Sequence, residues 1–104
     1  MKTDYEFLKT EVDGHILTVT INRPDRMNAL HPPAHAEFDE VWNEFDQNEN
    51  LWVGIVTGAG DRAFSAGNDL KFQAQAGGKM DINIASSGFA GLTSRFNLTK
   101  PLIA

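Results

Sequence analysis

Apolar and polar residues alternate from His15 to Asn22, a two-residue period that predicts a half-buried β-strand. Its aliphatic side consists of Leu17, Val19 and Ile21. Residues 5–12 alternate less regularly and are separated from this run by Asp13-Gly14. Glycine adopts positive φ at little steric cost, so this pair favours a tight turn. The chain is therefore predicted to open with a β-hairpin.

A helical period begins after residues 23–30, which are predicted to form a loop because Pro24 cannot continue a strand. His31-Pro32-Pro33 suits a helix start, since the N–H that proline lacks would be unpaired in the first turn anyway. The apolar positions that follow recur at i, i+3, i+4 and i+7, and they are Phe38, Val41, Trp42 and Phe45. This pattern predicts an amphipathic helix ending between Gln47 and Asn50, with Trp42 and Phe45 in the core.

The β-branched run at 53–57 follows this helix and predicts a buried strand in a layered α/β core. A glycine-rich turn comes next, and then a short helix from Leu70 to Ala76 with Asn68 or Asp69 as its N-cap. Gly77-Gly78 would end that helix.

The remainder of the chain is less regular. Residues 81–98 have apolar positions roughly at helical spacing and are predicted to form a helix. Residues 100–104 begin another apolar run with no turn after it, which is an unusual place for a domain to end. The interpretation is that residues 1–104 are a fragment of a larger α/β domain.

Composition narrows the classes of function. Cysteine is absent, which excludes disulfides, thiolate metal sites and a cysteine nucleophile. No apolar run reaches the ~20 residues that span a bilayer, and we expect a soluble, cytoplasmic protein. The formal net charge of -5 disfavours nucleic acid and anionic membranes as partners. An anionic ligand would need local cations, and four lie in or beside candidate loops, although each taken singly is interpreted as solvated surface charge: Arg23, Arg26, Arg62 and Lys71.

Several motifs suggest other chemistry, but their context is wrong. Residues 58–63 match G-x-G-x-x-A after a strand, yet the loop continues where a dinucleotide-binding fold needs a helix. His31 and His35 are four residues apart without a glutamate base between them, so they are interpreted as surface or helix-start histidines and no metal site is expected. Ser65 lacks the G-x-S-x-G context of a serine hydrolase.

The two loops at 23–30 and 58–70 each follow the carboxyl end of a predicted strand, where ligands bind in layered α/β structures. Ala66-Gly67-Asn68 would let a backbone N–H approach a ligand closely, and a helix beginning just beyond adds its positive dipole end. An N–H held in this way stabilises an oxyanion. By spacing alone, however, a glycine-rich loop before a short helix is more often only a turn.

Three segments together, residues 20–30 (TINRPDRMNAL), 53–70 (VGIVTGAGDRAFSAGNDL) and 100–104 (KPLIA), resemble the enoyl-CoA hydratase/isomerase (crotonase) superfamily. The resemblance covers nearly the whole chain in the family's order. It implies the amino-terminal portion of a crotonase-like ββα spiral core.

The resemblance also implies roles for individual residues. It places Asn68 at the first oxyanion-hole position, where the backbone N–H contacts the thioester oxygen. The family commonly has alanine at this position, and an amide side chain there would restrict or orient the acyl group. The residues that the resemblance assigns to substrate and coenzyme A binding are Arg26, Met27, Ala29, Ala66, Gly67, Asn68, Asp69, Leu70 and Lys71.

The activity that the resemblance implies is that of an enoyl-CoA hydratase, a lyase that adds water to a 2-enoyl-CoA thioester. The alternatives are an enoyl-CoA isomerase of the same family and a catalytically inactive acyl-CoA-binding module. No cofactor is expected, since coenzyme A is part of the substrate, and the complete protein would form a trimer or a dimer of trimers. The second oxyanion N–H and the catalytic carboxylates would lie beyond Ala104, and Glu37, Glu40 and Glu44 are assigned to a solvated helix face.

Overall fold

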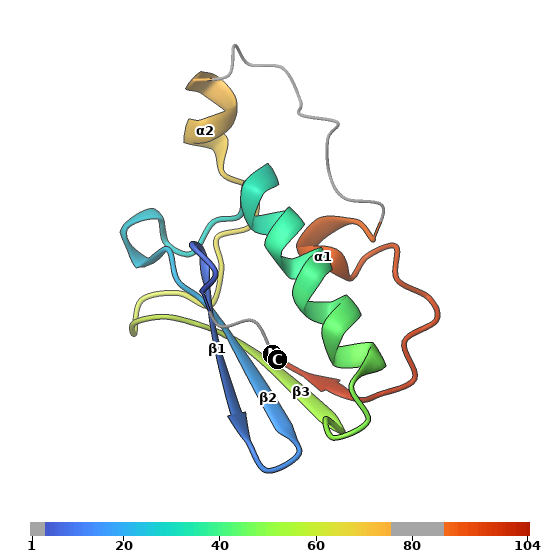
Figure 1. The fold of residues 1–104 in the computed structure, drawn as a ribbon. Coiled ribbons are helices and arrows are strands. Elements are labelled where there is room, and N and C mark those ends of the chain that lie inside the picture. Colours follow the sequence, from blue (N-terminus) through green and yellow to red (C-terminus); the bar gives the residue numbers. More distant parts are fainter. Residues whose placement is uncertain (1–3, 76–86) are drawn as a thin grey trace.

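The computed structural model describes residues 4–75 and 87–104. Its strands form one mixed sheet in the order β1-β2-β3-β4 (Figure 1). Strands β1 (Leu8–Asp13) and β2 (Ile16–Ile21) pair antiparallel across a turn in which Gly14 has a φ of 59°. Strands β3 (Val53–Gly58) and β4 (Leu102–Ile103) continue the sheet in parallel with β2. The predicted hairpin and the strand at 53–57 are confirmed, and the apolar run at 100–104 contains β4. Strand β3 was expected to be buried, but it is only partly buried, and Ile103 of β4 is 55% exposed.

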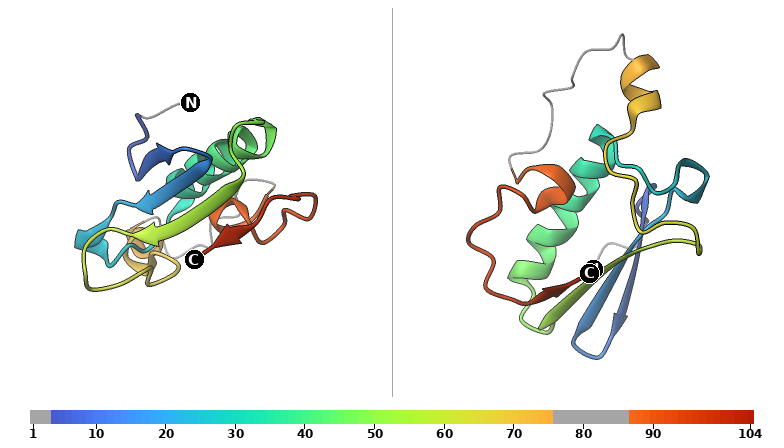
Figure 2. Two further views of the ribbon diagram at one scale, coloured as in Figure 1. Left: turned by 90° about the horizontal axis from the view of Figure 1, so that it is seen from below. Right: turned by 180° about the vertical axis from the view of Figure 1, so that it is seen from behind.

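Helix α1 (Pro32–Gln47) packs along one face of this sheet (Figures 1 and 2). Its apolar stripe is fully buried, as the helical spacing predicted, and it includes Phe38, Val41, Trp42 and Phe45. Alternate residues of β2 complete this core from the sheet, namely Leu17, Val19 and Ile21. Lys100 donates from Nζ to the carbonyl oxygens of Phe45 and Asn48, both at 2.6 Å, and so links the end of the helix to the segment that leads into β4.

The segment after residue 86 corrects the predicted helix. Within 87–98 the structure has only the short 3₁₀ turn η2 (Phe89–Gly91), in which Ala90 has a φ of 56°. Gly88 and Gly91 also have positive φ, and an α-helix cannot contain such residues. Contacts with α1 hold the turn, because Trp42 Nε1 donates to the Ala90 carbonyl at 3.0 Å. Residues 81–86 and the expected Gly77-Gly78 stop lie outside the described residues.

Two short elements flank the loops at the carboxyl end of the parallel strands. The 3₁₀ turn η1 (Pro24–Arg26) lies in the first loop, and α2 (Leu70–Gln75) follows the second. Figure 1 shows both loops and α2 on the same side of the molecule, beyond the ends of β2 and β3. In the part of the chain described here, no helix is long and apolar enough to cross a membrane.

Candidate functional site

The two loops begin side by side because their strands are parallel and in register. Ile21, the last residue of β2, is the partner of Gly58, the last residue of β3. This last pair is completed by the Ala59 N–H, which donates to the Ile21 carbonyl at 2.8 Å. The expectation that each loop follows the carboxyl end of a strand is confirmed, and the parallel pairing places the two ends at one edge of the sheet.

Asn28 joins the first loop to the second. Its side-chain oxygen accepts from the Arg23 N–H at 3.0 Å, and its Nδ2 donates to the carbonyls of Ala59 at 2.9 Å and Ala63 at 2.8 Å. Asn28 is 1% exposed and has a φ of 56°, a conformation that asparagine tolerates better than most residues. Sequence analysis did not assign Asn28 to the site; its side chain organises both loops from within.

A second link fixes the loop around Asn68. The Leu30 N–H donates to the Gly67 carbonyl at 2.7 Å, and the Asp69 N–H donates to the Leu30 carbonyl at 2.8 Å. These bonds form a parallel bridge between Leu30 and Asn68. In such a bridge the neighbours of Asn68 make both bonds, so its own N–H and C=O point to the side opposite Leu30. The Asn68 side chain is exposed.

Gly67 supplies the bend before Asn68. Its φ is +88°, and a Cβ added there would meet nothing within 4 Å. The position therefore needs glycine for its backbone conformation, and the space beside it is open. Ser65 supports the bend by donating from Oγ to the Asn28 carbonyl and accepting from the Gly67 N–H, at 2.8 and 3.1 Å. Ser65 thus serves the loop structure.

Asp69 is buried and paired with cations of the first loop. Arg23 Nη2 lies 2.9 Å from Asp69 Oδ2, and Arg26 Nη1 lies 3.7 Å from the same oxygen. Asp69 Oδ1 accepts from the Phe72 N–H at 2.9 Å, which makes Asp69 the N-cap of α2. Burial favours a higher pKa for Asp69, but the Phe72 N–H and the two guanidinium groups outweigh it and lower the pKa.

The interpretation of Arg23 as solvated surface charge is wrong, because only 8% of this residue is exposed. Its Nη1 donates to the Ala29 carbonyl, its Nη2 pairs with Asp69, and its guanidinium carbon lies 5.7 Å from the centre of the Phe7 ring. A carbonyl oxygen, a carboxylate and an aromatic ring replace the water that this charge would otherwise bind. Sequence alone gave no signal that Asp69, 46 residues away, would pair with it.

His31 and His35 were interpreted as surface or helix-start histidines, and they stand at the start of α1. The surface alternative does not hold, since 5% and 1% of these residues are exposed. The His31 ring packs edge-on against Phe7 and Phe72, and its Nδ1 is buried without a hydrogen-bond partner. Burial, aided by the nearby Arg23 guanidinium, lowers the pKa of His31 to about 4. Both rings are therefore neutral at pH 7, and the His35 Nδ1 accepts from the Ala90 N–H at 2.9 Å.

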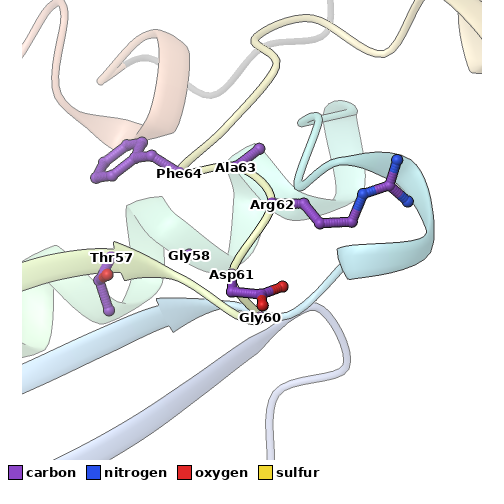
Figure 3. A pocket seen from close by; sticks show the side chains of 7 residues that line it. All are labelled: Thr57, Gly58, Gly60, Asp61, Arg62, Ala63 and Phe64. Atoms are coloured by element: carbon purple, nitrogen blue, oxygen red, sulfur yellow. The ribbon is translucent and has the colours of Figure 1, made fainter.

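Two hollows open on the turn that follows β3. Figure 3 shows the larger one, of about 330 Å³, which is lined by Thr57, Gly58, Gly60, Asp61, Arg62, Ala63 and Phe64. A smaller one, of about 130 Å³, lies between the loops and includes Pro24, Met27 and Asn28 among its lining residues. In Figure 3 the Arg62 side chain extends toward the first loop.

The residues predicted for the site differ in how accessible they are. Among them, Ala66, Asn68, Leu70 and Lys71 are exposed, Arg26, Met27 and Gly67 are half-buried, and Ala29 and Asp69 are buried. The Ala66 N–H donates to the Met27 carbonyl at 3.0 Å, so the two loops are joined on this side also. The structure thus brings the predicted residues of both loops together and turns two of them inward.

Comparison with known proteins gives a consistent set of relatives. Carnitinyl-CoA dehydratase from Escherichia coli is 44% identical over 99 residues, which are 95% of this chain and 37% of that protein. Carnitinyl-CoA hydratase from Mycobacterium avium is similar in structure with a TM-score of 0.79, at 31% identity over 93% of this chain and 37% of that chain. Enoyl-CoA hydratase from Mycobacterium tuberculosis has a TM-score of 0.77 and 32% identity, covering 92% of this chain and 36% of that chain.

These structures confirm the expected α/β fold of the crotonase type. The chain spans a little over a third of the length of the relatives it matches. A family model described as enoyl-CoA hydratase/isomerase matches residues 11–104. The chain belongs to the enoyl-CoA hydratase/isomerase family.

Proposed function

We propose that residues 1–104 form the amino-terminal part of a single hydratase-type domain and carry half of its acyl-CoA thioester site. The observation that carries this proposal is the bridge between Leu30 and Asn68, which turns the Asn68 main-chain amide away from the first loop. The named relatives act on, or form, coenzyme A thioesters of the carnitinyl and enoyl type. We therefore assign a 2-enoyl-CoA or a 3-hydroxyacyl-CoA as the substrate, with coenzyme A as part of it and no separate cofactor.

In this proposal the Asn68 N–H donates to the thioester oxygen as negative charge develops there. A fixed donor of this kind contributes about 3–4 kcal/mol to transition-state stabilisation, since it needs no reorganisation when the charge appears. The exposed Asn68 side chain would lie beside the acyl group and help to orient it. Gly67 keeps the approach open because it has no side chain.

Five of the remaining predicted residues would hold the coenzyme A moiety. Arg26 and Lys71 supply cations that are at least partly accessible, and phosphate groups are the natural partners of such cations. Met27, Ala66 and Leu70 offer apolar surface around them. We assign no general base within residues 1–104, so polarisation of the carbonyl is the chemistry that we propose for this part of the site.

The test uses acetyl-CoA labelled with ¹³C at the thioester carbonyl. Hydrogen bonding to a carbonyl oxygen weakens the C=O bond, so we expect infrared difference spectra to show the bound carbonyl at a lower frequency than free acetyl-CoA. Asn68→Ala keeps the main-chain donor and should keep the shift, whereas Asn68→Pro lacks an N–H and should lose it. Circular dichroism of both variants shows whether the fold is retained.

Calorimetric titration with acetyl-CoA, together with assays of crotonyl-CoA hydration and carnitinyl-CoA dehydration, separates the possible functions. Turnover by the complete protein supports the hydratase, and binding by the complete protein without turnover supports an acyl-CoA-binding module. A wild-type protein that binds acetyl-CoA without any carbonyl shift contradicts the role of the Asn68 amide. A protein that does not bind acetyl-CoA contradicts the proposed site altogether.

A further inference from the structure

One guanidinium group connects the two loops of the site. Arg23 donates from Nη1 to the Ala29 carbonyl in the first loop and from Nη2 to the Asp69 carboxylate in the second. Its own main-chain N–H is held by Asn28, the residue that also fixes the turn after β3. A planar guanidinium presents its donors in a fixed fork, so these bonds set the orientation of Asp69 relative to the first loop.

Asp69 is the residue directly after the proposed oxyanion donor. Its N–H donates to the Leu30 carbonyl, which is one of the two bonds of the bridge around Asn68. Its carboxylate is fixed at the same time by Arg23, by Arg26 and by the Phe72 N–H. Both the main chain and the side chain of Asp69 are therefore fixed by bonds to other residues. The Asn68 amide lies next to Asp69 in the chain, so its peptide plane has little freedom to rotate.

The burial of Asp69 argues against direct contact with a ligand. Only 5% of the residue is exposed, and both carboxylate oxygens already have partners within the protein. A buried ion pair adds little net stability relative to apolar residues of similar volume, and its best-attested use is to specify one arrangement. The ion pair between Arg23 and Asp69 is therefore expected to fix the loop geometry more than to stabilise the fold.

We infer that Arg23 and Asp69 are positioning residues, whose ion pair holds the Asn68 main-chain amide in the orientation needed for the thioester oxygen. This inference rests on the proposed function. It assigns Asp69 to the support of the site instead of coenzyme A binding, and it adds Arg23, which the motif analysis left out.

The first measurement needs no ligand. In Arg23→Met, amide hydrogen exchange measured by NMR should be at least tenfold faster at Leu30 and Asp69, because the side-chain anchor of their bridge is gone. The amides of β2 and β3 should exchange within about twofold of the wild-type rates. Asp69→Asn, which keeps a neutral acceptor for Arg23, should show a smaller increase at the same two amides. Lys9→Met removes an exposed cation from β1 and serves as the matched control.

The second measurement asks whether the amide still acts on the carbonyl. In Asp69→Asn and Arg23→Lys, affinity for coenzyme A without an acyl group should stay within about threefold of wild type. The infrared shift of bound ¹³C-acetyl-CoA should fall by at least half, because a lysine cannot bond Ala29 and Asp69 through one planar fork. A residue that only stabilised the fold would not separate these two readouts.

The outcomes are distinct. Unchanged exchange at Leu30 and Asp69, or an equal increase throughout the sheet, overturns the positioning role. A tenfold loss of coenzyme A affinity in Asp69→Asn also overturns it, since Asp69 would then act as a ligand. A third outcome is that the variants show faster exchange at the bridge while the wild-type protein shows no carbonyl shift. In that case Arg23 and Asp69 still position the loop, but the proposed function is contradicted.

Discussion

At the scale of single residues, His31 is a buried histidine close to the Arg23 guanidinium. Its ring is enclosed between Phe7 and Phe72, and its Nδ1 is buried without a hydrogen-bond partner. Such a ring is held neutral, because protonation would place a second charge beside Arg23 without water to solvate it. We therefore expect the fold to lose stability in acid.

We expect stability to fall as the pH is lowered through the range between the two pKa values of His31. The pKa is about 4 in the folded protein and 6.5 in the unfolded chain, so the unfolded chain binds the proton first. Stability should be level above pH 6.5, decrease by at most about 1.4 kcal/mol per pH unit from this histidine between pH 6.5 and 4, and lose no more from it below pH 4. Urea unfolding at half-unit pH steps measures the slope.

His31→Phe removes the titrating group and keeps an aromatic ring between Phe7 and Phe72. Its slope between pH 6.5 and 4.5 should be smaller than that of the wild type. Some slope should remain, because burial also lowers the pKa of His35. Asp69 acts in a separate window: its pKa is lowered below 3.8 on folding, so its contribution is lost only at more acidic pH. Equal slopes in the two proteins would show that His31 does not titrate as described.

Polar residues of the site were the hardest to predict, for a physical reason. A polar side chain in a loop is normally solvated, and its burial depends on partners that local sequence does not reveal. Arg23 is buried by Asp69 and Phe7, and Asn28 by carbonyl groups beyond residue 58. Sequence motifs identified the Asn68 loop as a candidate, but the residues that hold this loop could be recognised only when both loops were seen together.

At the scale of secondary structure elements, the end of β3 determines whether the second loop can fold back over the sheet. A Cβ added at Gly58 would meet the Phe64 carbonyl oxygen, and it would lie 2.7 Å from both the Ala63 carbonyl oxygen and Asn28 Nδ2. Two of these are backbone atoms, which cannot move without breaking the hydrogen bonds of the loop. Gly58 is therefore required for space and not for its dihedral angles.

We expect Gly58→Ala to destabilise the protein by about 2–3 kcal/mol in urea unfolding, which is typical of overpacking at a rigid site. Gly14→Ala is the matched control, because a Cβ there meets nothing within 4 Å and the cost is limited to the strain of its positive φ, about 1 kcal/mol. If both substitutions have the same effect, the crowding at Gly58 is not the cause.

Elements with a clear local period were predicted from the sequence, and those shaped by distant contacts were not. Strand β2 and helix α1 each bury one side in the same core, so their apolar residues recur with the period of a strand and of a helix. The 87–98 segment has apolar residues at similar spacing, yet Ala90 adopts a positive φ while bonded to Trp42 and His35 of α1. Tertiary contacts replaced helical hydrogen bonds there.

At the scale of the whole molecule, the two faces of the sheet differ. Helix α1 covers one face (Figure 2). Side chains on the other face stay partly accessible. Paired residues of neighbouring strands place aliphatic side chains together on this outer face, namely Ile16 beside Val53 and Ile55 beside Ile103. Ile16 is 41% exposed and Ile103 is 55% exposed.

Parallel strands in proteins are usually covered on both faces, because their side chains are apolar on both. We therefore expect the 104-residue protein to associate as its concentration rises, and we expect Ile16→Thr/Ile103→Thr to shift this association to at least threefold higher concentration in sedimentation velocity experiments. Threonine keeps the β-branched shape that suits a strand while adding a hydroxyl group, so the sheet should persist.

Val12→Thr is the matched control for this expectation. Val12 is 53% exposed, and it lies in register with Leu17, whose side chain is buried in the core beneath α1. The same chemical change there removes exposed aliphatic surface from the opposite face of the sheet. If association depends on the outer face, Val12→Thr should behave like the wild type. If Val12→Thr instead shifts association as much as Ile16→Thr/Ile103→Thr does, exposed apolar area in general drives association. A wild-type protein that sediments as a monomer at every concentration would mean that the threonines around these isoleucines, Thr18, Thr20 and Thr57, hydrate the face sufficiently.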